Sequence, residues 1–119
     1  QCIYISNHAN ASGLGEATGT EVYTTPGKDR SDKLADLYWK NFEKLLAKDI
    51  TFRPDHSDGD PDREANFFVL KNTKMPAVMI EHGFIDNYED ALLLTNDRII
   101  DLFVETQVRT ILDYMKSLE

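Results

Sequence analysis

The chain has 119 residues, of which 41% are hydrophobic, and this size and composition are typical of one globular domain rather than of a disordered segment. Its net charge of −8 argues against a sequence-independent grip on nucleic acid and against adsorption to anionic membranes, because both need a basic surface. No apolar run reaches the roughly 18 residues of a transmembrane helix, so we expect no membrane span. The single cysteine, Cys2, excludes a disulfide within the chain, and its apolar neighbours favour a buried position in a strand.

The first half of the chain predicts two strands and a helix. Residues 2–6 alternate β-branched and aromatic side chains, which is typical of a strand, and a glycine-rich loop over 12–19 follows. Residues 20–25 predict a second strand. Apolar side chains at helical spacing then predict an amphipathic helix over 32–48, for which Ser31 is a suitable N-cap.

The polar segment 53–66 contains a run of acidic residues that invites a calcium-binding interpretation. The spacing fails the EF-hand template, which needs acids at alternate positions before the glycine and a later bidentate glutamate. We therefore expect a solvated loop, with His56 exposed.

The second half adds a buried strand and two helices. A short apolar run over 67–70 precedes residues 76–80, a continuous apolar stretch typical of a strand buried on both faces. Helical spacing returns over 88–94 and 97–117. This order of elements predicts an α/β fold with a mostly parallel twisted sheet and helices on both faces.

Two of the predicted strands run into side chains that can bind a metal or transfer a proton. His8 follows the first strand, and Glu81 follows the strand over 76–80, close to Gly83. Strand ends are where α/β proteins place catalytic groups, so a histidine and a glutamate delivered in this way suggest a metal-assisted hydrolase.

Four ordered segments point to a family. They are Ser-Asn-His-Ala-Asn-Ala (6–11), Gly-Thr-Glu-Val-Tyr (19–23), Ser-Asp-Lys-Leu-Ala (31–35) and Pro-Ala-Val-Met-Ile-Glu-His-Gly-Phe-Ile-Asp-Asn (76–87). With these segments the sequence resembles the zinc-dependent N-acetylmuramoyl-L-alanine amidases of the amidase-3 type, which occur in bacterial autolysins and phage endolysins. Together the segments span nearly the whole chain, which makes the resemblance far more specific than any one of them.

The resemblance implies a Zn²⁺ cofactor, with His8 as a zinc ligand and Glu81 as the catalytic acid and base. The other two ligands of the family, a histidine after the first strand and a glutamate on the next helix, have no match here and are expected upstream of Gln1. Residues 1–119 are accordingly expected to be a single catalytic domain that lacks its N-terminal part. Zinc would polarise the amide carbonyl, and Glu81 would pass a proton from water to the leaving amine.

The implied partner is peptidoglycan, cleaved between N-acetylmuramic acid and L-alanine, and a monomer is expected. An autolysin would act outside the cell or in the cell wall, whereas a phage endolysin would pass from the host cytoplasm to the wall. One alternative is a non-catalytic peptidoglycan-binding or regulatory relative that has lost the metal. Another is a different metallohydrolase that uses His8, Glu81 and His82 as its own triad.

Five further polar residues are assigned from their positions. Asn10 is expected to brace the loop that carries His8 by hydrogen bonding to the backbone. His82 follows the catalytic glutamate directly, and because strand neighbours point to opposite faces, a buried or supporting role is favoured over a direct one. Arg53 and Arg63 could bind a carboxylate of the stem peptide, although solvated surface positions are favoured. Glu21 is interpreted as lying at the edge or rim of the sheet.

Overall fold

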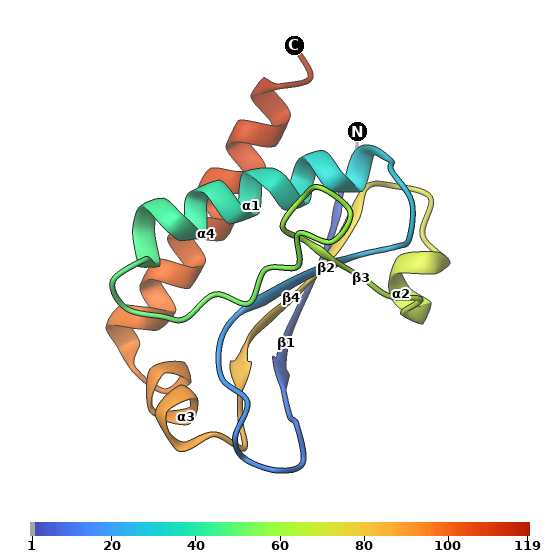
Figure 1. Cartoon of the computed structure of the whole chain (residues 1–119). Helices are drawn as coiled ribbons and strands as arrows, with labels where there is room; N and C mark the ends of the chain where they lie inside the picture. Colours follow the sequence, from blue (N-terminus) through green and yellow to red (C-terminus); the bar gives the residue numbers. More distant parts are fainter. Residues whose placement is uncertain (1) are drawn as a thin grey trace.

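A computed structural model describes residues 2–119 and shows one sheet with helices packed against it (Figure 1). In chain order the elements are β1 (Tyr4–Asn10), β2 (Glu21–Thr24), α1 (Arg30–Leu46), β3 (Arg63–Glu64), α2 (Phe68–Lys71), β4 (Ala77–Phe84), α3 (Tyr88–Leu94) and α4 (Asp97–Lys116). None of the helices in residues 2–119 combines the length and the apolar character needed to cross a lipid bilayer.

The strands follow the order β1-β4-β2-β3, so β4 lies between β1 and β2. The β1–β4 and β2–β3 pairs are parallel, whereas β2 and β4 are antiparallel. The predicted α/β class is confirmed, and its mostly parallel sheet holds for two of the three strand pairs. Helices α1 and α4 pack against each other. The short helix α2 lies near the start of β4 (Figure 1).

The main core lies between one face of the sheet and the pair of helices α1 and α4. Val22, Val78 and Ile80 point to this face and are buried against side chains of both helices, including Phe42 and Phe103. A smaller cluster on the opposite face joins alternate residues of β4, Ala77 and Met79, to Leu70 of α2. This alternation along β4 decides which functional side chains share a face, because successive side chains of a strand point to opposite sides.

Three local predictions differ from the structure. The N-cap of α1 is Asp29, which forms a capping box with Asp32, while the hydroxyl of Ser31 accepts a hydrogen bond from the Ala77 backbone. Both β1 and β4 extend beyond the predicted ranges 2–6 and 76–80, because each pairs with the other past its apolar run. Cys2, which we expected to be buried, is exposed.

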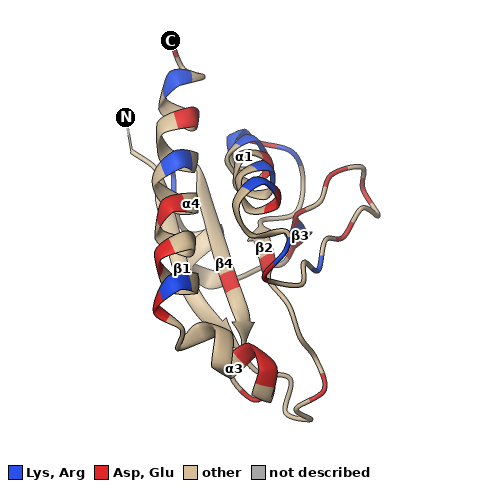
Figure 2. Cartoon of the chain, turned by 90° about the vertical axis from the view of Figure 1, so that its left-hand side faces the viewer, with Lys and Arg blue, Asp and Glu red and all other residues tan. Residues whose placement is uncertain are grey.

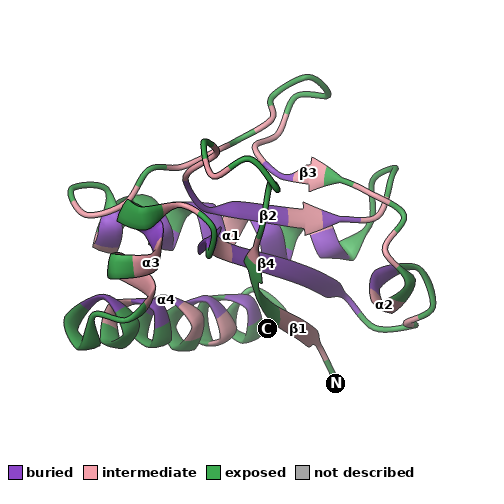
Figure 3. Ribbon diagram, turned by 90° about the horizontal axis from the view of Figure 1, so that it is seen from below, coloured by how far each residue is buried: buried purple, intermediate pink, exposed green. Residues whose placement is uncertain are grey.

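One side of α4 remains uncovered. The predicted apolar residues of this helix divide into two groups: Ile99 and Phe103 are buried, whereas a row on the outer surface is exposed (Figure 3). This α4 outer row consists of Ile100, Val104, Val108, Leu112 and Met115. Part of it lines a groove of about 510 Å³ whose other wall is β1, the strand at the edge of the sheet.

Candidate active site

His8, Glu81 and Glu21 form a row across three adjacent strands. His8 of β1 is in register with Glu81 of β4, and Glu81 is in register with Glu21 of β2. Neighbouring strands lie about 4.8 Å apart and residues in register project to the same face, so these side chains converge on one surface. The two segments that the sequence singled out, more than seventy residues apart, therefore meet in the fold.

Glu81 has the features of a general base. Its side chain is 8% exposed, and its Oε2 atom is buried without a hydrogen-bond partner among the described residues. Burial raises the pKa of this carboxyl above its ordinary value, an effect that the nearby His8 opposes and the charge of Glu21 reinforces. A carboxylate with a free oxygen and a raised pKa is suited to accept a proton and to return it.

His8 lies on the exposed side of the row. Its Nε2 atom is 2.7 Å from the hydroxyl of Ser6, which projects from the same face of β1 two residues earlier. Since β1 is the edge strand, the imidazole is open to the side of the sheet where no described strand lies. An exposed imidazole is a common metal ligand, and here it lies beside a carboxylate whose free oxygen can accept a proton.

Glu21 is buried at the centre of a polar network, so its predicted position at the edge or rim is wrong. Its side chain is 3% exposed and accepts hydrogen bonds from the Asn10 amide at 2.9 Å and the Tyr23 hydroxyl at 3.1 Å. The Nε atom of Arg63 lies 2.7 Å from Oε2 of Glu21, and that of Arg53 lies 3.8 Å away. With its oxygens engaged, Glu21 positions its neighbours and is not free to bind a metal.

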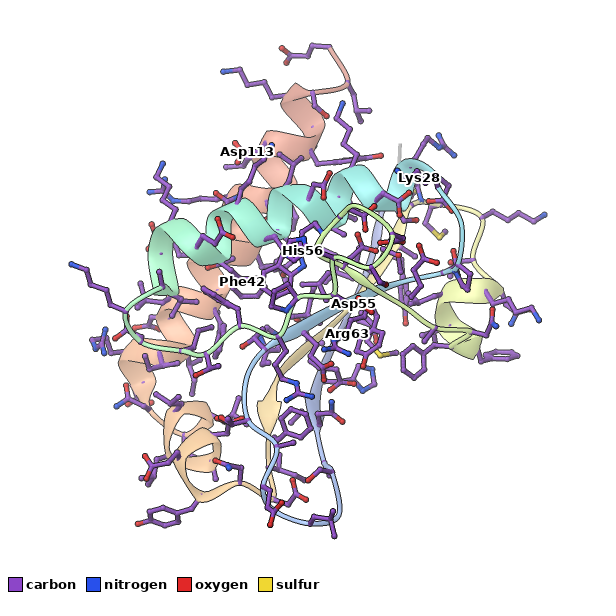
Figure 4. All side chains as sticks on the ribbon, viewed as in Figure 1. Lys28, Phe42, Asp55, His56, Arg63 and Asp113 are labelled. Atoms are coloured by element: carbon purple, nitrogen blue, oxygen red, sulfur yellow. The ribbon has the colours of Figure 1, made fainter. Side chains whose placement is uncertain are left out.

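The ion pairs with Glu21 hold Arg53 and Arg63 in position beside the site. Arg63 extends from β3, beneath the loop that carries Asp55 and His56 (Figure 4), and also donates to the carbonyl of Arg53. The guanidinium of Arg53 lies 5.2 Å from the centre of the Phe84 ring. Both arginine side chains are about one-third exposed, so each combines an ion pair to Glu21 with a solvent-facing part.

Asn10 links β1 to β2. Its amide nitrogen donates to Glu21, and its side-chain oxygen accepts from the backbone of Ala11. The predicted contact with the local backbone is therefore present, and the bond to Glu21 adds a contact between β1 and β2 that the sequence did not indicate.

His82 lies on the face opposite Glu81. Its ring packs against Phe103 with a centroid separation of 4.6 Å and against Phe42 at 6.5 Å, and its Nε2 is 2.8 Å from the Asn7 side chain. Burial lowers the pKa of His82 to about 4, so the ring is neutral at pH 7. His82 therefore points away from Glu81, although His8 and His82 both line the groove beside α4.

Asp90 is not among the residues that the sequence pattern singles out, yet it fixes the loop beside the site. It is buried and accepts hydrogen bonds from the backbones of Gly19 and Phe84, at 2.9 and 2.8 Å. Gly19 has φ of +112°, and a side chain there would meet the carbonyl of Thr51 at 2.8 Å, so both its conformation and its surroundings require glycine. Asp90 thereby holds the start of β2 against the end of β4.

The Amidase_3 family, described as N-acetylmuramoyl-L-alanine amidase, matches residues 1–113. The chain belongs to this family. Members of Amidase_3 are metal-dependent hydrolases, which agrees with the exposed imidazole and the free carboxylate oxygen found here.

Individual Amidase_3 relatives support the assignment. The N-acetylmuramoyl-L-alanine amidase CwlM of Bacillus licheniformis is 34% identical over 97 residues, which cover 82% of this chain and 34% of that protein. An endolysin of Bacillus phage SPP1 is 32% identical over 104 residues, covering 83% of this chain and 35% of its own length. The chain thus spans about a third of the length of these curated relatives.

A solved Amidase_3 structure shows the same fold. The crystal structure of the N-acetylmuramoyl-L-alanine amidase from Clostridium difficile 630 superposes with a TM-score of 0.83 at 28% identity, covering 97% of this chain and 58% of that one. The solved domain therefore contains a large part that has no counterpart among the residues described here.

The described residues supply only part of a metal site. Zinc sites in enzymes use three protein ligands. Among residues 2–119, the one group of three closely spaced carboxylate or imidazole ligands is Asp32, Asp60 and Asp62, which includes neither His8 nor Glu81. The exposed ring of His8 fits a metal at this surface, provided that further ligands join it, and the free oxygen of Glu81 lies beside it on the same face.

Proposed function

We propose that the whole protein hydrolyses the amide bond between N-acetylmuramic acid and L-alanine in bacterial peptidoglycan, with Zn²⁺ as the cofactor. The observation that carries this proposal is the register of His8 with Glu81, whose buried Oε2 has no hydrogen-bond partner within residues 2–119. The relatives named as amidases and endolysin support the substrate.

The chain's own residues carry out the proton transfers. Glu81 accepts a proton from the attacking water as the water oxygen bonds to the lactyl carbonyl carbon, and returns that proton to the nitrogen as the carbon–nitrogen bond breaks. The products are a carboxylate on the glycan and a free amine on L-alanine. The raised pKa of Glu81 brings its two protonation states closer to equal population at neutral pH, as this exchange requires.

His8 provides one ligand for the metal. When bound, zinc supplies positive charge that polarises the amide carbonyl. Ser6 holds the His8 ring in place through its hydroxyl, and the Glu21 network keeps β1, β4 and β2 in the register that sets the imidazole beside the carboxylate. Arg53 and Arg63 pair with Glu21, which lies beside Glu81, and both are partly exposed. Their exposed parts would contact a carboxylate of the stem peptide.

We further propose that a part of the protein outside residues 2–119 supplies the remaining ligands. Two features support this: among residues 2–119 no strand pairs with the outer edge of β1 beside His8, and the α4 outer row lies exposed across the adjoining groove. An unpaired edge and a row of apolar side chains together fit an added strand followed by an amphipathic helix. The solved relative, of which this chain covers 58%, has the additional length for such a segment.

The setting of this reaction is the bacterial cell wall. An autolysin reaches the wall from outside the cell, and a phage endolysin reaches it from the host cytoplasm. The relatives include the endolysin of Bacillus phage SPP1 and the N-acetylmuramoyl-L-alanine amidase LytC of Bacillus subtilis. We propose that the protein acts there as a monomer, in which a further segment of the same protein would cover the groove beside β1.

The proposal is tested with the whole protein on purified peptidoglycan, by measuring newly exposed N-terminal L-alanine. Glu81→Gln should lower turnover by about 10²–10⁴-fold, the usual contribution of a general base. Glu43→Gln, the same change at an exposed site on α1, is the matched control and should leave turnover unchanged. Saturable muropeptide binding without turnover by the wild type would instead establish a non-catalytic wall-binding protein.

A further inference from the structure

A second group of potential metal ligands lies away from the catalytic row, where the N-terminus of α1 meets the loop that precedes β3. One oxygen from each of Asp32, Asp60 and Asp62 lies within 4.8 Å of the other two. We call these residues the aspartate cluster. The loop that supplies two of them carries a conspicuous run of acidic residues beside α1 (Figure 2).

Asp62 departs most clearly from the solvated loop that the sequence predicted. It is 1% exposed, and only one of its oxygens is engaged, by the hydroxyl of Thr24 on β2. Its Oδ1 atom is buried without a hydrogen-bond partner, and the same is true of Oδ1 of Asp60. Buried polar atoms almost always have a hydrogen-bond partner or a bound ion. Two free carboxylate oxygens at one place therefore indicate that a ligand binds between them.

The charge balance at the cluster leads to the same conclusion. Burial raises the pKa of Asp62 to about 7, an effect that the hydrogen bond from Thr24 opposes and the neighbouring carboxyl groups of Asp60 and Asp32 reinforce. Burial also raises the pKa of Asp32, with a further contribution from Asp60. Closely spaced carboxylates that lack a basic partner are stabilised by a bound cation.

We infer that the aspartate cluster binds a calcium ion. Its ligands are all carboxylate oxygens, which suit Ca²⁺ and Mg²⁺ and not the nitrogen and sulfur preference of zinc. Calcium is favoured over magnesium because it accepts irregular sets of oxygen ligands at 2.3–2.6 Å, whereas magnesium demands a near-ideal octahedron. Two of the aspartates come from a loop and one from a helix, which is an irregular set of this kind.

The bound ion has a structural role. Asp32 belongs to the first turn of α1, Asp62 is hydrogen-bonded to β2, and the residue after it is Arg63, which pairs with Glu21. Calcium at this place fastens the loop to both elements and so holds Arg63 against the network beside the catalytic row. The site is separate from the zinc site and does not depend on the proposed reaction.

The experiment uses the whole, zinc-loaded protein freed of other metals, and follows calcium binding by calorimetry and unfolding by a thermal melt. Calcium at about 100 times its Kd should bind one ion per chain and raise the unfolding midpoint by roughly 5–10 °C. Asp60→Asn should weaken calcium affinity at least about tenfold, because affinity follows the number of charged ligands. The exposed Asp101→Asn on α4 is the matched control and should behave as the wild type.

Asp62→Asn provides a second loss of a ligand and should also reduce calcium binding. A midpoint in the wild type that calcium does not move would overturn the inference, since a proton shared between Asp60 and Asp62 would then balance the charge. An equal calcium shift in the wild type and in Asp60→Asn would overturn it as well. Neither outcome bears on turnover, so the result is independent of the amidase proposal.

Discussion

Replacing Arg63 by methionine should destabilise the fold, because it leaves the buried carboxylate of Glu21 without its main cationic partner. Removing one member of a fully buried ion pair costs about 3–5 kcal/mol. Here the Glu21 side chain is 3% exposed but that of Arg63 is 30% exposed, so water partly replaces the lost contact. Asn10 and Tyr23 remain as hydrogen-bond donors to the carboxylate. We therefore expect Arg63→Met to cost about 2–3 kcal/mol.

A double-mutant cycle isolates the interaction itself. Glu21→Gln removes the charge, and the double variant should be more stable than the sum of the two single effects predicts, by about 1.5–3 kcal/mol. The exposed pair of Glu105 and Arg109, one helical turn apart on α4, is the matched control and should show a coupling of at most about 0.5 kcal/mol. Urea unfolding followed by fluorescence of Trp39, the single tryptophan and a buried one, measures all of these variants.

The result that refutes this reasoning is a coupling between Glu21 and Arg63 no larger than that of the control pair. In that case the ion pair would not hold β3 against β2. The network beside Glu81 would then depend on Asn10 and Tyr23 alone.

Three further predictions concern buried groups around the site. Because burial lowers the pKa of His82 from 6.5 to about 4, only the unfolded chain gains a proton between these values, and stability should fall as the pH drops from 6.5 to 4, by at most about 3 kcal/mol. His82→Gln should reduce this pH dependence in urea titrations, and an unchanged dependence would contradict the assigned burial. Asp90→Ala should cost about 2–4 kcal/mol by leaving the amides of Gly19 and Phe84 without their acceptor, and a melt within 1 °C of the wild type would count against it. Phe42→Ala should cost about 3–5 kcal/mol in the same urea assay, because the ring is fully buried among aromatic neighbours, and a loss below about 1 kcal/mol would disprove that packing.

The sequence predicted the elements well wherever periodicity carried the information. The helices over 88–94 and 97–117 match α3 and α4 almost to the residue, because apolar spacing and caps define a helix locally. The opposite orientations of Glu81 and His82 also followed from local geometry, since neighbours in a strand alternate in direction.

The order of the strands in the sheet depends on contacts between distant segments, so the local sequence pattern could not predict it. Glu21 looked like a rim residue because nothing in segment 20–25 indicates that β2 pairs with β4 and receives Arg63 from β3. The same reason explains the end of β4: its apolar run stops at Ile80, but pairing with β2 continues to Glu81 and pairing with β1 continues to Phe84.

The burial of Asp62 illustrates the limit for polar loops. Composition indicates that segment 53–66 is solvated on average, and His56 is indeed exposed. A single aspartate in that segment is nevertheless buried against Thr24, which lies 38 residues earlier in the chain. Only the packing of the loop onto α1 and β2 brings Asp32 and Asp60 beside it.

The most direct test of the proposed zinc site is the zinc content of the whole protein, measured together with turnover on peptidoglycan in the same preparations. His8→Ala should lose both bound zinc and turnover, whereas Glu81→Gln should keep its zinc and lose turnover by about 10²–10⁴-fold. Full zinc content in His8→Ala, or undiminished turnover in Glu81→Gln, would contradict a reaction centre built on these two residues.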